Sequence, residues 1–472
     1  MSTTTCAEWI SRNPGDARSV LNLANWRNIA SVLWLSSLRR GLFARVDPVT
    51  RGWAVVTSAG VLRLGLGFVA SLAIARALGP ANFGTYAVLA GSVSVVGGLA
   101  EGGLTEAAVL RVSAAWPDDT PAAKERGRAF FWLRLGLATV VVALGCVLAG
   151  PVSRAALGVD EGLLRWALLG IVATAASGAV SALLQATLAW RRMSALTLVN
   201  AGLTAVLAIA LALAGKLDLL AALVGLGIGT SVVTFLVARG MLPTPLSLRA
   251  PSVTVLGREA VHLVRTGRWL WVASIFAMVT ANAEVLLLNR QTALPLVGAY
   301  ALALNLASKA DLVNSSLYTV LLPGVTGLRD RAAVGSYVRR GFLRGGLIGL
   351  GLVLLIPFSE PLIVRIYGAE FAPAVVFFRW LLGVMVFDVL LTPLLLLPLA
   401  YRQARLLAAA DALRAVTLVL VAMGAIPAYG AIGAILARLA ARLAGAVLVL
   451  GALWLTRPPL EVQYEESARV SQ

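Results

Sequence analysis

Long apolar runs recur along this chain, and each is long enough to cross a membrane. A transmembrane helix needs about 20 apolar residues to cross the hydrocarbon core of a bilayer. Of the 472 residues, 59% are hydrophobic and 13% are charged, against roughly 45–50% and 25% in an ordinary soluble domain. The predicted fold class is therefore an all-α polytopic membrane protein.

Counting runs of this length gives about 12 transmembrane helices in two groups of six. The first group comprises Trp53 to Ile74, Thr85 to Leu110, Phe130 to Ala149, Leu163 to Trp190, Leu196 to Gly215 and Leu217 to Ala238. The second comprises Trp269 to Asn289, Leu294 to Leu321, Phe342 to Ile366, Ala374 to Tyr401, Ala404 to Ile426 and Ala428 to Leu455.

The Lys and Arg residues of the connections predict the orientation of these spans. If the N terminus is cytoplasmic, the inside connections and termini carry 27 of the 40 Lys and Arg, and the outside connections carry 5. Positive residues gather on the cytoplasmic side of membrane proteins. The count predicts that both termini are cytoplasmic, and a bacterial inner membrane is the expected location.

A short internal repeat supports the division into halves. Gly84-Thr85-Tyr86-Ala87 opens the second span and Gly298-Ala299-Tyr300-Ala301 opens the eighth. An even number of spans separates the copies, so both enter the membrane in the same direction. This predicts two parallel six-helix lobes around a central cavity. The tyrosine of each copy is expected to anchor at the outer membrane interface.

The predicted domains follow from these spans. Residues 1–52 form a basic extension, interpreted as an amphipathic helix on the inner membrane surface, with a disordered segment or a start codon assigned too early as the alternative. Residues 53–238 form the N-terminal lobe and 269–456 the C-terminal lobe. A proline-containing cytoplasmic linker, 239–268, joins them, and 457–472 form a cytoplasmic tail.

Several classes of function lack the residues they need. Two cysteines and one histidine provide no disulfide framework, zinc site or histidine-based catalytic triad. No nucleotide-binding motif G-x-x-x-x-G-K-[ST] occurs, so we expect no cofactor and no enzymatic activity. The basic residues are dispersed rather than gathered in a patch, which argues against nucleic acid and indicates anionic phospholipid as a partner.

Cationic and amide side chains inside the spans are the candidate substrate-binding groups. A charge in a span is costly unless it pairs or faces a water-filled cavity. Arg63 lies near the middle of the first span, and the alternative for it is an ion pair with a neighbouring helix. The remaining candidates are Lys309, Arg290, Asn305 and Asn314.

Acidic residues inside the spans are candidates for ion coupling: Glu284, Asp311 and Asp388. Glu284 could instead pair with Arg63 or Lys309. Asp411 and Arg414 are three residues apart and predict a local pair. Arg438 and Arg442, one turn apart, could bind near Asp411 or form a second cationic face.

Three motifs resemble one transporter family. Ala73 to Leu89 reads A-I-A-R-A-L-G-P-A-N-F-G-T-Y-A-V-L, with a tight turn at Gly79 to Gly84 after the first span. Val297 to Leu302 with Leu322-Pro323, and Ile366 to Phe371, are the other two. They resemble polysaccharide and lipid-linked oligosaccharide flippases, the Wzx type of the multidrug/oligosaccharidyl-lipid/polysaccharide (MOP) exporter superfamily. The resemblance implies alternating access by two lobes and assigns no individual cavity residue.

The leading hypothesis is a flippase that moves undecaprenyl-diphosphate-linked oligosaccharide outward for surface polysaccharide synthesis. Such a polyprenyl diphosphate headgroup needs a wet, electropositive cavity because isolated charge is expensive in a low-dielectric medium. Polysaccharide polymerases and glycosyltransferases are the expected protein partners. The main alternative is a cation-coupled drug or metabolite antiporter of the same superfamily, which should show a compact acidic cation site.

Overall fold

The computed structural model describes residues 48–243, 246–326, 331–401 and 403–456. Within helices, some side chains are also outside the described set, among them residues 310–316. The predicted amphipathic helix of the extension therefore lies almost wholly outside the described residues, as does the predicted tail. Residues up to Ser58 form a unit separate from Ala59 onward, and the contacts below all belong to the second unit.

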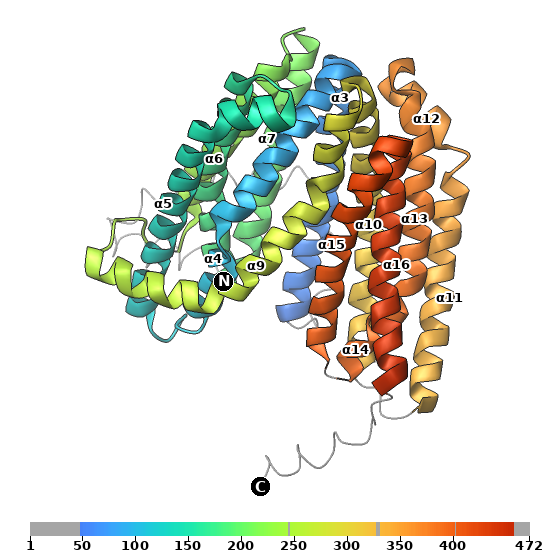
Figure 1. Ribbon diagram of the computed structural model, residues 1–472. Coiled ribbons are helices and arrows are strands. Elements are labelled where there is room, and N and C mark those ends of the chain that lie inside the picture. Colours follow the sequence, from blue (N-terminus) through green and yellow to red (C-terminus); the bar gives the residue numbers. More distant parts are fainter. Residues whose placement is uncertain (1–47, 244–245, 327–330, 402, 457–472) are drawn as a thin grey trace, which may run out of the picture. The chain divides into compact units, whose positions relative to one another are not determined.

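Every regular element in the described part of the chain is a helix (Figure 1). The N-terminal half contains α3 (Pro48–Glu101), α4 (Leu104–Ser113), α5 (Thr120–Val152), η1 (Ser153–Leu157), α6 (Glu161–Ala186), α7 (Trp190–Leu213), η2 (Ala221–Gly229) and α8 (Thr230–Met241). The C-terminal half contains α9 (Val253–Gln291), α10 (Leu294–Thr326), α11 (Arg331–Leu355), α12 (Ser359–Tyr367), η3 (Ala369–Phe371), α13 (Pro373–Leu395), α14 (Leu397–Ala400), α15 (Ala404–Tyr429) and α16 (Ala431–Thr456).

Each of the twelve predicted spans lies largely in helix, although the second is interrupted at Gly102 and Gly103 and the ninth is interrupted between α11 and α12. Among described residues, nine helices are long and apolar enough to cross a membrane, and the pair α11 and α12, bent by 55°, is a tenth candidate. The first of the nine contains two predicted spans, and the non-helical Gly79 separates them. The 33-residue α10, whose side chains are only partly described, is the predicted eighth span.

The first two spans meet at Gly79. This residue leaves helical geometry at φ 69° and ψ 172°, a left-handed value that glycine adopts without steric cost. Pro80 then begins the next helical stretch, at a position where a missing N–H is tolerated. The predicted turn from Gly79 to Gly84 is thus shorter than expected, because residues from Pro80 on are already helical. We call this end of the bundle the Gly79 end and the opposite one the Arg111 end.

The two copies of the repeat pack directly on each other at the Gly79 end. A methyl group on Gly84 would collide with the carbonyl oxygen of Leu294 and the amide of Gly298. Conversely, a methyl group on Gly298 would collide with the carbonyl oxygen of Pro80 and the amide of Gly84. Gly84 meets Leu294, which lies four residues before Gly298. In the same way Gly298 meets Pro80, which lies four residues before Gly84, so the contact is self-complementary. Such reciprocity is the property of an interface with two-fold symmetry.

The second span continues this close packing along α9. Gly98 leaves no room for a side chain beside Met278. At the Arg111 end, Gly103 and Gly267 touch through their backbones. Small residues allow helices in membranes to approach this closely. The second span is therefore held against the C-terminal half along its length.

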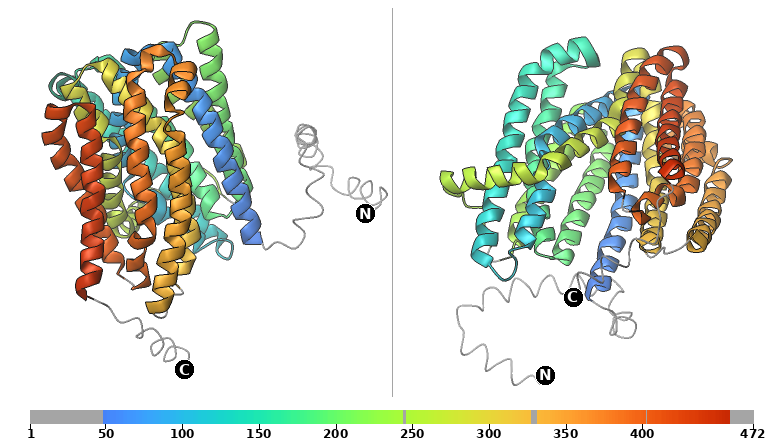
Figure 2. Two further views of the ribbon diagram at one scale, coloured as in Figure 1. Left: turned by 90° about the vertical axis from the view of Figure 1, so that its right-hand side faces the viewer. Right: turned by 60° about the horizontal axis from the view of Figure 1, so that its bottom comes forward.

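The helix α9 begins well before the predicted seventh span. Ser252 caps its first turn by accepting a hydrogen bond from the amide of Val255, and the helix continues without a break to Gln291. Residues 253–268 of the predicted linker are therefore helical. Figures 1 and 2 show this first part running across the N-terminal helices before α9 rises beside α15.

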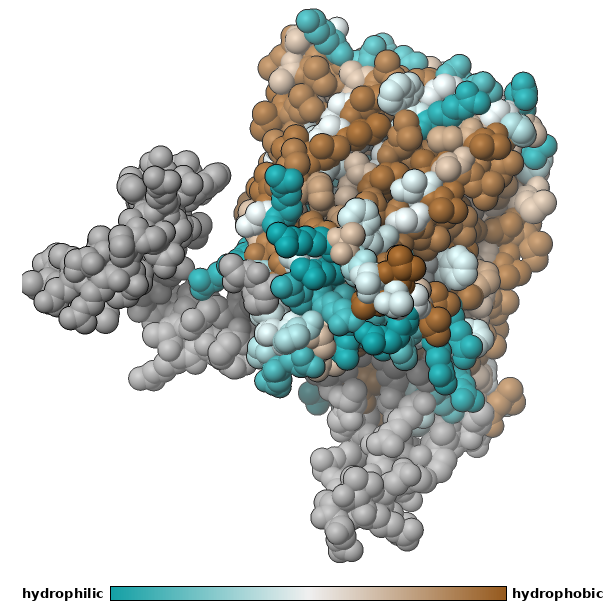
Figure 3. All heavy atoms as spheres, turned by 90° about the vertical axis from the view of Figure 1, so that its left-hand side faces the viewer, coloured by the Kyte–Doolittle hydropathy of each residue, from teal (hydrophilic) through white to brown (hydrophobic). Residues whose placement is uncertain are grey.

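The outer surface of the bundle is largely apolar. Large hydrophobic side chains such as Val147, Leu213 and Val447 are mostly exposed. Figure 3 shows a broad apolar surface with hydrophilic residues gathered below it, towards the Arg111 end. A soluble protein would bury such a surface, and here it can face lipid.

Candidate functional site

The first candidate region lies between the first span and α10. Ser71 donates a hydrogen bond to Oδ1 of Asn305 at 3.3 Å, which joins the two helices. One turn further along α10, half-buried Lys309 lies within electrostatic range of exposed Arg63. No described carboxylate forms an ion pair with either cation. The structure thus brings together three predicted site residues, Arg63, Lys309 and Asn305.

Of the three other predicted site residues, one lies apart from this cluster, and the side chains of the other two are not described. Arg290 is exposed in the last turn of α9, and no described contact joins it to Arg63 or Lys309. The side chains of Asp311 and Asn314 lie outside the described residues, although α10 continues through both positions. Their predicted roles stay predictions.

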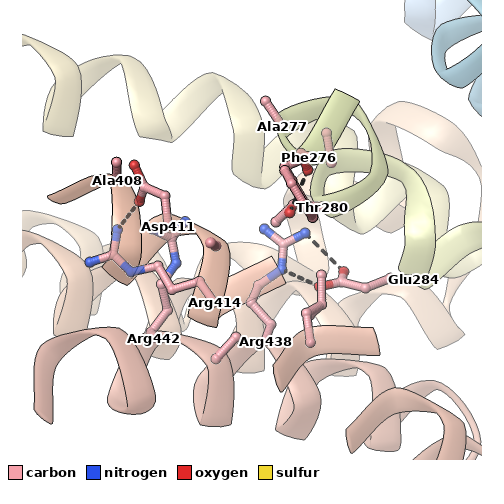
Figure 4. Close-up of a pocket in the computed structure, with 13 residues that line it drawn as sticks. Phe276, Ala277, Thr280, Glu284, Ala408, Asp411, Arg414, Arg438 and Arg442 are labelled. Atoms are coloured by element: carbon pink, nitrogen blue, oxygen red, sulfur yellow. Dashed lines mark hydrogen bonds and ion pairs between the residues drawn. The ribbon is translucent and has the colours of Figure 1, made fainter. Parts of the chain in front are cut away.

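A second region is a cavity of about 700 Å³ among α9, α15 and α16 (Figure 4). Its walls combine apolar side chains, including Phe276 and Leu418, with five charged residues: Glu284, Asp411, Arg414, Arg438 and Arg442. Figure 4 shows two separate ion pairs on opposite sides of the space. The C-terminal half therefore holds a largely apolar cavity of its own that carries charged side chains.

Glu284 and Arg438 form the strongest pair at this cavity. The guanidinium of Arg438 donates from Nε and from a terminal nitrogen to the two carboxylate oxygens, both at 2.8 Å. Tyr300, fully buried, donates its hydroxyl to the same carboxylate. Only 1% of Glu284 is exposed. A bidentate guanidinium pair with a further donor satisfies most of the acceptor positions of a carboxylate.

The other two acids also meet arginines. Asp388 lies 3.3 Å from Nε of Arg442. Arg414 donates to Asp411 at 2.8 Å, as predicted from their spacing. The side chain of Arg414 lies across Gly445 of α16, where a methyl group would collide with it. In each of the three pairs, the cation is an arginine of α15 or α16 that lines the cavity.

The structure corrects two expectations, one for the partner of Glu284 and one for the place of Tyr300. Glu284 pairs with Arg438 and not with Arg63 or Lys309, because α16 rather than the first span packs against this face of α9. Tyr300 is buried against Glu284 instead of anchoring at a membrane interface. Its ring also contacts Phe377, at 6.0 Å between ring centroids.

Glu284 and Arg438 lie at the same depth in the bundle, and this match was a signal in the sequence that could have predicted their pair. Glu284 lies seven residues before the end of α9 at Gln291, and Arg438 seven residues after the start of α16 at Ala431. Both helices terminate at the Gly79 end, since Gly430 approaches Thr292. At 1.5 Å per residue both charges lie about 10 Å from that end. Opposite charges at equal depth are the natural partners in a membrane.

A bundle of helices long and apolar enough to cross a membrane, with paired charges at depth and a self-complementary contact between its halves, defines a polytopic membrane protein. Residues 73–376 match the family described as polysaccharide biosynthesis protein. The chain belongs to this family. Among curated proteins, none matches the chain.

Solved structures share the fold at low identity. An inward-facing multidrug resistance MATE family transporter of the MOP superfamily is 16% identical, with 85% of this chain and 96% of that chain covered and a TM-score of 0.64. The lipid II flippase MurJ, in an inward closed conformation, is 12% identical over 85% and 87%, with a TM-score of 0.67. The eukaryotic MATE transporter AtDTX14 is 15% identical over 90% and 100%, with a TM-score of 0.58.

These comparisons confirm the predicted family and fold class. The chain is a multi-pass membrane protein of a polysaccharide biosynthesis family, and it shares its fold with MATE transporters and with the lipid II flippase MurJ. The proteins that it resembles are transporters and flippases rather than enzymes.

Proposed function

We propose that this protein flips a polyprenyl-diphosphate-linked oligosaccharide from the inner to the outer leaflet of a bacterial inner membrane. The undecaprenyl carrier lipid stays in the bilayer while the diphosphate and sugars pass through the cavity between the lobes. The delivered unit then serves surface polysaccharide synthesis, with glycosyltransferases before this step and a polymerase after it. The family membership supports the pathway, and the site supports an anionic substrate.

The observation that carries this proposal is that two cationic side chains, Arg63 and Lys309, lie within electrostatic range of each other. Two cations within electrostatic range of each other, with no described carboxylate paired to either, repel one another. A diphosphate placed between them would relieve that repulsion and accept hydrogen bonds from both. Asn305 and Ser71 supply further polar groups beside the same position. The arrangement therefore suits a substrate with at least two negative charges.

Glu284 and Asp388 disfavour the alternative, a cation-coupled antiporter. A coupling cation or proton at either acid would have to displace an arginine that already holds the carboxylate at 2.8 or 3.3 Å. Breaking a buried ion pair costs roughly 3–5 kcal/mol. The described acids of the C-terminal cavity are thus neutralised by the protein itself. We therefore propose that flipping needs no coupling ion at these two residues.

The orientation belongs to the same proposal. With the Arg111 end in the cytoplasm, the Gly79 end faces outward and both termini are cytoplasmic. Reporter fusions after residues 158, 216 and 291 should be active only outside, and fusions after residues 117 and 250 only inside. Reversed activities would contradict the proposed direction of export.

Deletion and site variants test the function. Cells that lack this protein should accumulate lipid-linked sugar on the inner leaflet and lose surface polysaccharide. Complementation with Arg63→Gln or Lys309→Gln should fail although the protein inserts in the membrane at a normal level. Arg165→Gln is the matched control, because Arg165 is exposed, forms its ion pair with Glu161 on its own helix and otherwise donates to the carbonyl oxygen of Cys146. Full complementation by both site variants would show that the substrate does not bind there.

A further inference from the structure

The first part of α9 is longer than membrane crossing requires. The helix has 39 residues, while about 20 suffice to span the hydrocarbon core. The excess lies at its start, from Val253 to Arg268, where Figures 1 and 2 show the helix crossing the N-terminal helices near the Arg111 end. We call residues 253–268 the crosswise segment.

One face of the crosswise segment is fixed to the N-terminal half. Glu259 is almost fully buried and pairs with Arg111 of α4 at 3.0 Å. Leu263 is buried one turn later, and the next turn brings Gly267 against the backbone of Gly103. Among the described residues, this face of the segment therefore packs against the N-terminal half.

A second face is apolar and uncovered. Val253, Val261 and Val264 are 85%, 68% and 59% exposed. At 100° per residue the three side chains fall within a stripe of about 80°, next to the buried face. A soluble helix would not display such a stripe beside its contact face.

The third face is basic. Arg258 and Arg265 lie two turns apart on it. Arg268 follows one turn after Arg265, within the angular range of the apolar stripe. Arg258 forms an ion pair with Glu125 of α5. Within the described residues, neither Arg265 nor Arg268 has a carboxylate partner. These two guanidinium groups are available for an anion from outside the protein.

Trp269 marks the depth of the segment in the membrane. It is 72% exposed, and the guanidinium carbon of Arg268 lies 5.7 Å from the centroid of its ring. Tryptophan side chains favour the interface between headgroups and hydrocarbon. Figure 3 shows hydrophilic residues gathered at the same end of the bundle, below the apolar surface. The crosswise segment therefore leaves the span at headgroup level.

We infer that the crosswise segment is an interfacial helix that binds anionic phospholipid headgroups. Its three exposed valines enter the boundary of the acyl chains, while Arg265 and Arg268 contact lipid phosphates. A basic face beside an apolar face is the pattern of helices that lie in the plane of a membrane surface. An anionic surface contributes about fivefold in partition for each nearby arginine. This inference does not depend on the transported substrate.

Lipid quenching at a defined position tests the inference. A fluorophore is attached at Val264→Cys in the full chain with Cys6→Ala and Cys146→Ala, reconstituted in phosphatidylcholine nanodiscs. Brominated phosphatidylglycerol or brominated phosphatidylcholine is then titrated in. We expect phosphatidylglycerol to be preferred by about fivefold or more at this position. A second probe at Leu420→Cys on α15, exposed and apolar, should show no preference.

The arginines are then removed. Arg265→Gln with Arg268→Gln should reduce the preference at residue 264 to the value at residue 420, whereas Arg165→Gln should leave it unchanged. In the chain with both arginines present, 1 M salt should also abolish the preference for phosphatidylglycerol at residue 264. This measurement tests the inference even if the double variant does not fold. Equal quenching by both lipids, a preference that survives the double substitution and high salt, or no quenching by any lipid would each overturn the inference.

Discussion

Arg438 occupies the position beside Glu284 that a coupling cation would need. Its two bonds of 2.8 Å and the hydroxyl of Tyr300 hold the carboxylate where only 1% of the residue is exposed. Burial makes this pair sensitive to loss of one partner, because the remaining charge stays desolvated. Arg414 and Asp411 differ, since the carboxylate is 72% exposed.

Removing either member of the Glu284–Arg438 pair should destabilise the protein. Glu284→Gln and Arg438→Gln should each lower the free energy of unfolding by roughly 3–5 kcal/mol, measured by thermal or denaturant unfolding in detergent. The double variant should recover part of this loss. Glu161→Gln, which breaks the exposed pair with Arg165, should cost about 0.5 kcal/mol or less. Equal losses from Glu284→Gln and Glu161→Gln would contradict a buried pair.

Gly445 should control the placement of Arg414. A methyl group there would collide with Nε, Cγ and Cδ of Arg414, so Gly445→Ala should push the guanidinium into the cavity and away from Asp411. Overpacking of this kind costs about 1–3 kcal/mol, which thermal unfolding would detect. Gly451→Ala on the same helix, where nothing lies within 4 Å, serves as the control and should leave stability nearly unchanged.

The two halves meet where α3 packs against α10, at Gly84 and Gly298. Gly84 and Gly298 allow backbone contact that no other residue type permits, and each helix contributes the same motif. Contacts between the second span and α9 continue from there to Gly103. In the proposed alternating access the halves separate at one end at a time, so we expect this contact to close the Gly79 end.

Substitution at this contact should open the Gly79 end. In Gly84→Ala or Gly298→Ala, the methyl group meets backbone atoms that cannot move without shifting a whole helix. We expect a Val88→Cys thiol, buried in the present state, to react faster with a membrane-impermeant reagent when either substitution is present. Gly97→Ala, with nothing within 4 Å, should leave the rate unchanged. An equal rate in all variants would mean that the contact does not close this end.

At the scale of the whole molecule, the membrane potential can supply the free energy for the proposed outward movement of the anionic headgroup. Each charge that crosses 100 mV changes the free energy by about 2.3 kcal/mol, so two negative charges moved outward gain about 4.6 kcal/mol. The neutralised acids Glu284 and Asp388 remove the most evident coupling site among the described residues. Export of a dianionic headgroup would therefore proceed without an ion gradient.

Flipping should follow the potential and not a sodium or proton gradient. In proteoliposomes that contain a lipid-linked oligosaccharide, a potassium diffusion potential of 100 mV, negative on the Arg111 side, should shift the lipid towards the other leaflet. The limiting shift is over a thousandfold, from the about 4.6 kcal/mol above. Imposed sodium or pH gradients without a potential should have little effect. Dependence on either gradient, with no response to potential, would favour the antiporter alternative.

Local properties of the chain explain why the spans, the repeat and the Asp411–Arg414 pair were predictable. Apolar length identifies a span by itself, and residues three apart on one helix are neighbours in any fold. The sequence also indicated Arg63, Lys309 and Asn305 together, since buried polar groups in a membrane usually face a common polar space. It left open which carboxylate each arginine meets, because the depth match of Glu284 with Arg438 does not by itself decide which helices are neighbours.

The amino-acid sequence alone therefore determined the all-helical membrane fold class and the positions of the long helices, since these depend on hydrophobic length along one chain, and it predicted two related halves from a short repeat. Only the tertiary structure decided that Gly84 meets Gly298, that Arg438 holds Glu284 and that α9 starts with a crosswise segment. Those features depend on which helix faces span neighbours far apart in the chain. In a bilayer many apolar faces pack about equally well, so the choice is made by small residues and paired charges in three dimensions.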